Sequence, residues 1–372
     1  LFFCTFVAYN APVANTPGAP LTVKTQTDMR ISRFITIVMV AWLASTLAAT
    51  AAPIDARTAR ATAQIFATQR GKQIVTPTAP LKVKGSTSTH APYYIYDVEN
   101  GGGFVIIAGD DRVPSILGYT DSGSYDEATL PDALRDMLAD YRHQIEALDS
   151  LPEAGQTSQS ASAMRAQVAH PSRRFVAPLL PTAWNQKDPY NQLCPVYNNS
   201  DGSSSGARSA TGCVATALGQ MMAYYRYPSA TMADIPSYSF TSGGKSIRMD
   251  AVAKGTKIDW NNIRNTYSAT NTEAEKTAVA QLMVILGTGC QMAYGAASAS
   301  NMQMGVQLLR DKMGYDETVR NVCRTNYTQT EWTDLLYREV AEGRPVGYRA
   351  NSTLRGGHAF VIDGYDTADL FH

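Results

Sequence analysis

The chain has 372 residues, of which 44% are hydrophobic and 17% are charged, a composition typical of a globular protein with room for two domains. Lysine plus arginine and aspartate plus glutamate number 32 each, so the formal net charge is zero. No excess of positive charge therefore attracts nucleic acid or an anionic membrane, and the composition argues against both as partners.

A basic start and a short apolar run stand at residues 29–51, not at the first residue. The pattern consists of two arginines in 29–33, an apolar run over 34–48 and an Ala-Thr-Ala cleavage pattern at 49–51. The run is too short to span a hydrocarbon core of about 30 Å, and a buried core helix would leave the basic flank unexplained. We therefore expect 1–28 to be an untranslated segment. We expect 29–51 to be a signal peptide that exports the protein, with no stable membrane anchor, to the periplasm, the cell surface or the medium.

Residues 52–150 are predicted to form a small α+β domain. Apolar residues recur at helical spacing near its end, and an Asn-Gly turn separates two β-rich runs. The predicted helices and strands are 59–69, 93–98, 103–108 and 130–148.

The stretch 151–174 joins this domain to the next. It is rich in serine, glutamine and alanine, which bury little apolar surface, so we expect a mobile linker. Proteolysis concentrates in mobile exposed segments. We expect the activation cleavage between Arg165 and Phe175, with Arg165, Arg173 and Arg174 as protease sites.

Residues 175–372 are predicted to form a second, larger domain of the α+β class, because its helices precede its strands. The predicted helices are 213–225, 272–286 and 330–341, and the predicted strands are 346–350 and 358–364. Two residues of this domain could carry chemistry, one at the beginning of a helix and one at the beginning of a strand.

Cys213 follows Gly212 at the beginning of the first of these helices. The partial positive charge at a helix N-terminus favours the thiolate, which is the nucleophile, and the glycine allows a substrate carbonyl to approach the sulfur. A cysteine among small residues is more often an inert buried side chain, so this motif alone is weak.

His358 follows Gly356 and Gly357 at the beginning of an apolar strand. A rigid strand can hold an imidazole against a cysteine on a facing helix, although a single histidine beside apolar residues is more often structural. The order of the two motifs, with the histidine well over a hundred residues after the cysteine, is typical of papain-like peptidases. A thiol within hydrogen-bond reach of an imidazole gives the thiolate–imidazolium pair that such enzymes use.

The chain has five cysteines, too few for a disulfide scaffold. Cys4 falls in the expected untranslated segment, and the sequence leaves the pairing of Cys194, Cys290 and Cys323 open. Neither a metal site nor a cofactor is predicted.

Longer motifs resemble those of the streptopain family of papain-like cysteine peptidases. Residues 212–228 are similar to the family's cysteine motif, 356–364 to its histidine motif, and 185–191 to an upstream motif whose glutamine helps to form the oxyanion hole. In the first domain, 103–119 resembles the family's inhibitory propeptide. The resemblance extends from about residue 54 to the end of the chain.

The resemblance implies a secreted cysteine endopeptidase zymogen of α+β fold. A papain-like catalytic domain, its helical part packed on an antiparallel sheet, would occupy 175–372, after an inhibitory propeptide domain over 52–150. The resemblance assigns Cys213 as the nucleophile of a thioester acyl-enzyme, His358 as its base and Gln186 as an oxyanion-hole donor. It also implies a substrate cleft, to which we assign four residues: Gly212, Gly357, Tyr294 and Gly295. The expected partners are protein or peptide substrates, with a bulky apolar side chain at the second residue before the cut, and the chain's own propeptide as an intramolecular inhibitor.

The sequence departs from the family at its end. The family follows its histidine motif with an Asn-Trp-Gly-Trp stretch that screens the catalytic pair, and the chain ends at His372, about two residues before that stretch would begin. We therefore expect the catalytic domain to be incomplete at its C-terminus, so this piece alone could be inactive although its parent enzyme is active.

Two other functions compete with a peptidase. A transglutaminase or an amidase would share the cysteine and the histidine but not the substrate. A secreted binding or inhibitor protein on the same scaffold would keep Cys213 as a structural residue, and its activity would lie in the propeptide-like domain. The presence of Cys213, His358 and Gln186 together favours the peptidase, because a binding protein needs none of the three.

Overall fold

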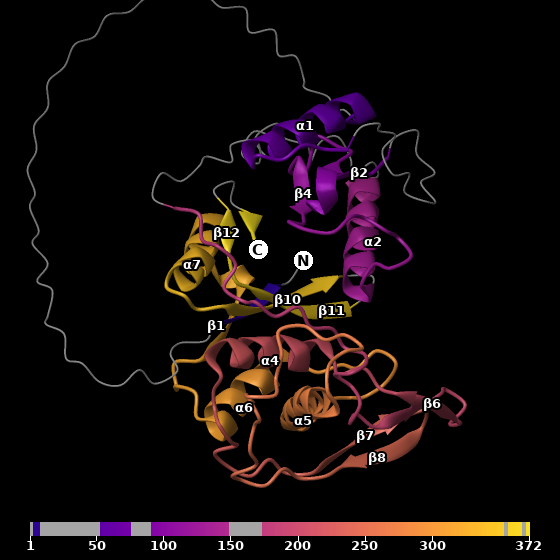
Figure 1. Ribbon diagram of the computed structural model, residues 1–372, viewed down its shortest axis with the longest axis vertical. Helices are drawn as coiled ribbons and strands as arrows, with labels where there is room; N and C mark the ends of the chain where they lie inside the picture. Colours follow the sequence, from indigo (N-terminus) through magenta and orange to yellow (C-terminus); the bar gives the residue numbers. More distant parts are fainter. Residues whose placement is uncertain (1–2, 8–52, 76–90, 149–172, 353–355, 367–369) are drawn as a thin grey trace, which may run out of the picture. The chain divides into compact units, whose positions relative to one another are not determined.

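The computed structural model describes residues 3–7, 53–75, 91–148, 173–352, 356–366 and 370–372, and it separates the chain into two compact units (Figure 1). The smaller unit lies within Ala14–Ala166, and the larger one combines Leu1–Val13 with Gln167–His372. The expected signal peptide and most of the expected linker lie outside the described residues.

The described residues of the smaller unit form a three-stranded antiparallel sheet and two α-helices. Its elements are α1 (Ala56–Gln69), β2 (Tyr93–Asp97), β3 (Phe104–Ala108), β4 (Ile116–Tyr119) and α2 (Asp132–Ala147), with strand order β2-β3-β4. Asp55 Oδ1 accepts a hydrogen bond of 2.7 Å from Thr58 N and caps α1. Asn100 and Gly101 take positive φ angles between β2 and β3, which confirms the predicted Asn-Gly turn. The two predicted helices and two predicted strands are confirmed, and β4 is a strand that the sequence reading did not identify.

Four described helices belong to the larger unit: α4 (Cys213–Tyr225), α5 (Glu273–Gly289), α6 (Met302–Met313) and α7 (Gln329–Ala341). Helix α4 consists largely of small and apolar residues, and most of its residues from Val214 to Met222 are buried. A helix that is apolar on all sides belongs in the interior of a domain. Three of these helices were predicted from the sequence, and α6 was missed.

The main sheet of the larger unit is antiparallel, with strand order β11-β10-β1-β9. These strands are β1 (Phe3–Val7), β9 (Arg320–Cys323), β10 (Val346–Ser352) and β11 (Gly356–Ile362). Strand β1 belongs to 1–28, and the interpretation of that segment as untranslated stays a prediction. Smaller two-stranded sheets pair β5 (Val196–Asn198) with β6 (Ser204–Arg208), β7 (Tyr238–Ser242) with β8 (Lys245–Met249), and β12 (Tyr365–Asp366) with β13 (Leu370–Phe371).

The main sheet has a hydrophobic core on each face. On one face, Ala359 of β11 joins the buried side chains of α4, α5 and α6. On the other, Val346 and Ile362 join Trp332 and Leu336 of α7. Figure 1 shows α4, α5 and α6 on one side of β10 and β11, with α7 on the other. The larger unit is therefore a sheet between helices, with α4 packed directly on the strand that carries the histidine motif.

Among the helices that the structure describes, none is both long enough and apolar enough to cross a membrane.

Helix α5 begins at a complete capping box. Thr272 Oγ1 accepts from Glu275 N at 3.3 Å, and Glu275 Oε2 accepts from Thr272 N at 2.9 Å. The same carboxylate accepts from Asn271 Nδ2 at 2.9 Å and from Arg264 Nε at 2.7 Å. These bonds, that from Asn271 first, lower the pKa of Glu275 from its ordinary value of 4.5 to about 2.

Glu275→Gln is therefore predicted to lower the melting temperature near neutral pH. The folded-state pKa is below the unfolded one, so the carboxylate stabilises the fold above about pH 4.5, and this contribution is lost as the pH falls towards 2. Thermal unfolding of both proteins between pH 7 and pH 3 should show a difference that shrinks as the pH falls through this window. Glu273→Gln, in the same turn with an 80% exposed side chain, is the control and should change little. A difference that stays constant over this range would contradict the assignment.

Candidate active site

Cys213 is the first residue of α4. It follows Gly212, which has φ 87° and ψ 136°, a backbone conformation that residues with side chains rarely adopt. The Cys213 side chain is half-buried, and its thiol is free. The helix N-terminus thus presents this thiol where the partial positive charge of the helix is greatest.

Helix α4 places the other candidate element beside it. The helix packs against β11, and Ala359, next to His358, is buried in the same cluster as Val214, next to Cys213. The cysteine and histidine motifs, distant in the sequence, are thereby brought to one contact between a helix and a strand.

His358 itself is half-buried and stands opposite Ala350 in the ladder between β10 and β11. Because side chains alternate along a strand, His358 shares a face with Ile362 and not with Ala359. The packing of α4 therefore fixes the strand beside Cys213. An imidazole that reaches α4 must do so around the beginning of the strand, where two glycines carry no side chain.

Gln186 is fixed close to the beginning of α4 by the backbone. Its carbonyl oxygen accepts a hydrogen bond of 3.1 Å from Thr211 N, two residues before Cys213. Trp184 N donates to Gln220 Oε1 of α4 at 3.2 Å, which holds the same segment to the helix. The half-buried Gln186 therefore lies in the loop that flanks the candidate nucleophile.

Other side chains lie close to both glycines assigned to the cleft, Gly212 and Gly357. A Cβ at Gly212 would lie 2.4 Å from Met292 Sδ, and a Cβ at Gly357 would lie 2.6 Å from both Arg349 Nε and Asn351 Oδ1. Gly212 is also buried. At Gly212 the positive φ and the close approach of Met292 both favour glycine, whereas at Gly357 the neighbours are the ends of two side chains. Contact of either glycine with substrate stays a prediction.

The other two residues assigned to the cleft, Tyr294 and Gly295, lie in different environments. Tyr294 is only 3% exposed, so its ring packs in the core and does not line an open surface. Gly295 lies beside the beginning of α4, because its carbonyl accepts from Ala210 N at 3.0 Å. The buried Ser298 Oγ donates to Ala210 O at 2.7 Å and accepts from Gly295 N at 3.0 Å. Sequence reasoning missed Ser298 and Met292, because neither residue type carries a signal of its own.

The remaining described cysteines differ from Cys213 in environment. Like Cys213, the cysteines Cys194, Cys290 and Cys323 form no disulfide. Burial raises the pKa of both the Cys194 and the Cys290 thiol to about 12. These two thiols stay protonated and inert, and the described thiols outside the core are those of Cys213 and Cys323.

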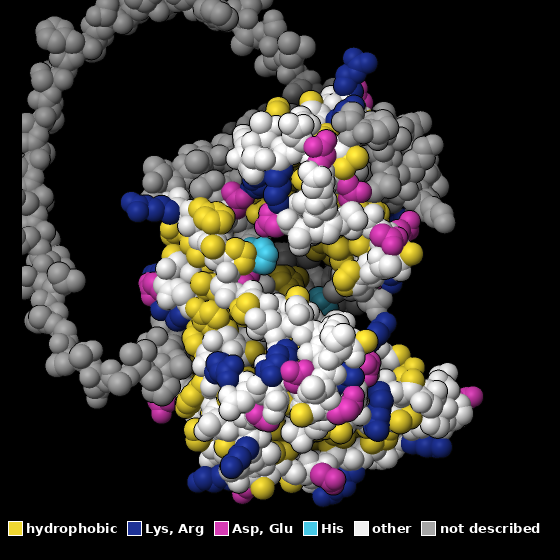
Figure 2. All heavy atoms as spheres, in the orientation of Figure 1, with side chains coloured by type: hydrophobic (Ala, Val, Ile, Leu, Met, Phe, Trp, Pro, Cys, Tyr) yellow, Lys and Arg dark blue, Asp and Glu magenta, His cyan; other side chains and the backbone are white. Residues whose placement is uncertain are grey.

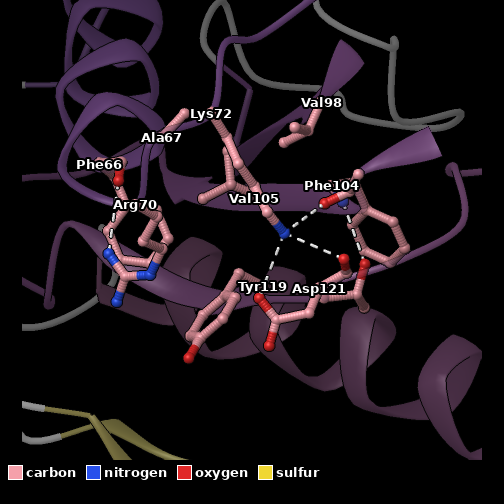
Figure 3. Close-up of a pocket in the computed structure, with 11 residues that line it drawn as sticks. Phe66, Ala67, Arg70, Lys72, Val98, Phe104, Val105, Tyr119 and Asp121 are labelled. Carbon is pink, nitrogen blue, oxygen red and sulfur yellow. Dashed lines mark hydrogen bonds and ion pairs between the residues drawn. The ribbon is translucent and has the colours of Figure 1, made fainter. Parts of the chain in front are cut away.

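A shallow pocket in the smaller unit offers no alternative active site (Figure 3). Lys72 Nζ donates to Gly102 O at 2.9 Å and to Asp121 O at 3.0 Å, and the Arg70 guanidinium lies 3.5 Å from the centre of the Phe66 ring. Both positive side chains are therefore already bound by groups of the protein. The remaining space holds about one water molecule, and the residues that line it include no cysteine or histidine.

The described residues include no group of three or more His, Cys, Asp or Glu side chains that could hold a metal ion. On the face shown in Figure 2, basic and acidic side chains are interspersed, without a large patch of one sign. This distribution agrees with the zero net charge and gives nucleic acid no basic surface on that face.

Comparison with known proteins relates both units to peptidase precursors. The model of the peptidase C10 family matches residues 184–372, and that of the Spi protease inhibitor matches residues 51–145. Streptopain from Streptococcus pyogenes is 33% identical over 287 residues, which cover 75% of this chain and 69% of streptopain. The thiol protease/hemagglutinin PrtT from Porphyromonas gingivalis is 28% identical over 335 residues, 87% of this chain and 37% of that protein.

A solved structure extends the likeness to the fold. A fragment of prointerpain A from Prevotella intermedia matches with a TM-score of 0.59 and 29% identity, covering 81% of this chain and 87% of that one. Fold, motifs and relatives together define a cysteine-type peptidase precursor of α+β, papain-like fold that carries an inhibitor domain. The chain belongs to the peptidase C10 family, and the resemblance to streptopain noted in the sequence is confirmed.

Gly212→Ala is predicted to destabilise the larger unit by about 1–3 kcal/mol, from backbone strain at φ 87° and from the clash with Met292. Met292→Ala removes the clash but not the strain, so Gly212→Ala should cost less in the Met292→Ala background. Urea unfolding of the four proteins of this double-mutant cycle measures the difference. Strictly additive costs would show that Met292 does not set the requirement for glycine.

Proposed function

We propose that the chain is the precursor of a secreted endopeptidase that hydrolyses peptide bonds with Cys213 as nucleophile and His358 as general base. The observation that carries the proposal is the packing of α4 on β11, which joins the two motifs at one contact. The sulfur attacks the peptide carbonyl and the C–N bond breaks, leaving a thioester, while the imidazole takes the thiol proton and delivers it to the leaving amine. Water then hydrolyses the thioester, and the imidazole now acts as its base.

Gln186 is proposed to donate a hydrogen bond to the oxyanion that forms on the peptide carbonyl. Its backbone bond to Thr211 supports this role, because it ties the glutamine to the residues directly before Cys213. A donor that is already in place before the reaction stabilises negative charge without reorganisation at the moment of attack.

The inhibitor-like domain and the signal-like segment extend the proposal to regulation and location. The smaller unit matches a protease inhibitor over residues 51–145, which supports a zymogen whose own first domain blocks the enzyme until the linker is cut. The basic, apolar and Ala-Thr-Ala pattern of 29–51 supports export by a signal peptide.

If Cys213 and His358 form a catalytic pair, the kinetic effects of mutating them in the processed full-length parent enzyme should be strongly non-additive. Cys213→Ala should abolish peptide hydrolysis, His358→Ala should cost nearly as much, and the double variant should be no slower than the worse single one, because residues that act as a unit fail together. Cys323→Ala removes the other described thiol outside the core and should keep full activity.

The measurement is the rate of hydrolysis of a fluorogenic peptide, with circular dichroism to verify that each variant folds. A normal rate of hydrolysis by the Cys213→Ala variant would show that Cys213 is not the nucleophile. If the fold-decrease in rate of the double variant equals the product of the two single fold-decreases, Cys213 and His358 do not act as a pair. An active enzyme that transfers acyl groups only to amines, not to water, would favour the transglutaminase alternative.

A further inference from the structure

The segment 173–180, here called the strap, runs alongside the chain that directly follows β11. Val176 N donates to Tyr365 O and Tyr365 N donates to Val176 O, each at 2.9 Å. Leu179 N donates to Asp363 O at 2.9 Å, and Leu180 N donates to Asp363 Oδ2 at 2.7 Å. The strap therefore supplies part of the hydrogen bonding of the residues that follow the histidine strand, including the Asp363 carboxylate, which is 4% exposed and also bonds to His372 Nδ1 at 2.7 Å.

The first residues of the strap are anchored on α7. Arg173 Nη2 and Nε donate to Asp334 Oδ1 at 2.7 and 3.1 Å, and the Arg173 side chain is only 2% exposed. Arg174 N donates to Tyr337 Oη at 2.9 Å, and the Tyr337 ring lies 4.9 Å from the Tyr365 ring. Both arginines, which the sequence assigned to the end of the linker, are thus held by the larger unit.

These contacts oppose proteolysis of the bonds after the two arginines. A protease that selects arginine must enclose the guanidinium and bind the neighbouring chain in an extended form, with free backbone groups. At this site the Arg173 guanidinium is buried against Asp334, and the amides of Arg174 and Val176 are already bonded within the protein. Cleavage there requires the strap to be released first.

We propose that the strap is a permanent part of the processed enzyme: activation cuts the chain before Arg173, and the Arg173–Asp334 pair protects the two later arginine bonds. The inference rests on the proposed function, in which the chain is a zymogen. It reduces the number of candidate activation sites, because it excludes cleavage after Arg173 and Arg174 and leaves Arg165 of the three arginines. Loss of the strap would leave Asp363 and the backbone after β11 without these partners, so a cut within it would damage the strand that carries His358.

Limited trypsin digestion of the full chain tests the proposal. All proteins carry Cys213→Ala, so that self-cleavage plays no part, and mass spectrometry identifies the first residue of each large fragment over time. In this background we compare no further change, Asp334→Ala, Tyr337→Phe and Asp311→Ala. The last is the matched control, since Asp311 is an exposed aspartate on helix α6 of the same unit.

In the parent and the control, the large fragment should begin upstream of Arg173 and keep the strap. Asp334→Ala should speed the appearance of fragments that begin at Arg174 or Phe175 by at least about tenfold, because it removes a charge-assisted hydrogen-bond pair. Tyr337→Phe, which retains the ring, should speed the cut after Arg173 by a smaller factor.

Two results would overturn the proposal: early fragments that begin at Arg174 or Phe175 in the parent, or unchanged cleavage of the strap in both test variants. The digestion involves no activity of the chain itself. Its outcome therefore decides the role of the strap whether or not the proposed peptidase activity is found.

Discussion

The packing of α4 on β11 is the constraint on which the candidate site depends. The cysteine motif and the histidine motif belong to different elements, and only this contact makes them neighbours. The helix cannot shift easily, because its buried residues are enclosed by α5 and α6 and protein interiors are close-packed. Loops on either side of Cys213 are then tied to the beginning of the helix through the carbonyl oxygens of Gln186 and Gly295.

The opposite face of the sheet holds the other end of β11 in place. There α7 contributes Trp332 and Leu336 to the second core, and it binds the strap that pairs with the chain after β11. Just before β10, Arg344 Nε donates to the fully buried Glu339 at 2.6 Å, which fixes the end of α7 to the sheet. A buried carboxylate of this kind is tolerated because its charge is paired. The C-terminal end of the histidine strand is therefore positioned by contacts other than the packing of α4.

The sequence predicted the elements that have strong local signals. Helices with capping residues, such as α5 and α7, and strands separated by an Asn-Gly turn, such as β2 and β3, lie where periodicity placed them. The missed helix α6 contains Gly305 and carries a weaker signal, although Asn301 caps it. Cys213, His358 and Gln186 could be proposed from the sequence because whole motifs surround them.

What could not be predicted depends on contacts between distant residues. Nothing in the sequence near Gly212 identifies Met292 as the side chain that fills the space beside it. Likewise, Arg173 looks like a linker residue until its partner Asp334, far along the chain, is known. Tyr294 lies in a segment similar to the family's cleft, and only the packing shows that its ring is buried.

The most direct test of the account is the rate at which Cys213 reacts with iodoacetamide near pH 6, where an imidazole that shares a proton with the thiol matters most. Peptide mapping by mass spectrometry follows Cys213 and the half-buried Cys323 in the same sample, so Cys323 is an internal control. We predict that His358→Ala slows the alkylation of Cys213 by at least about tenfold and leaves the alkylation rate of Cys323 unchanged. In the control variant His143→Ala, the alkylation rate of Cys213 should also be unchanged. An equal rate for Cys213 with and without His358 would contradict the proposed pair.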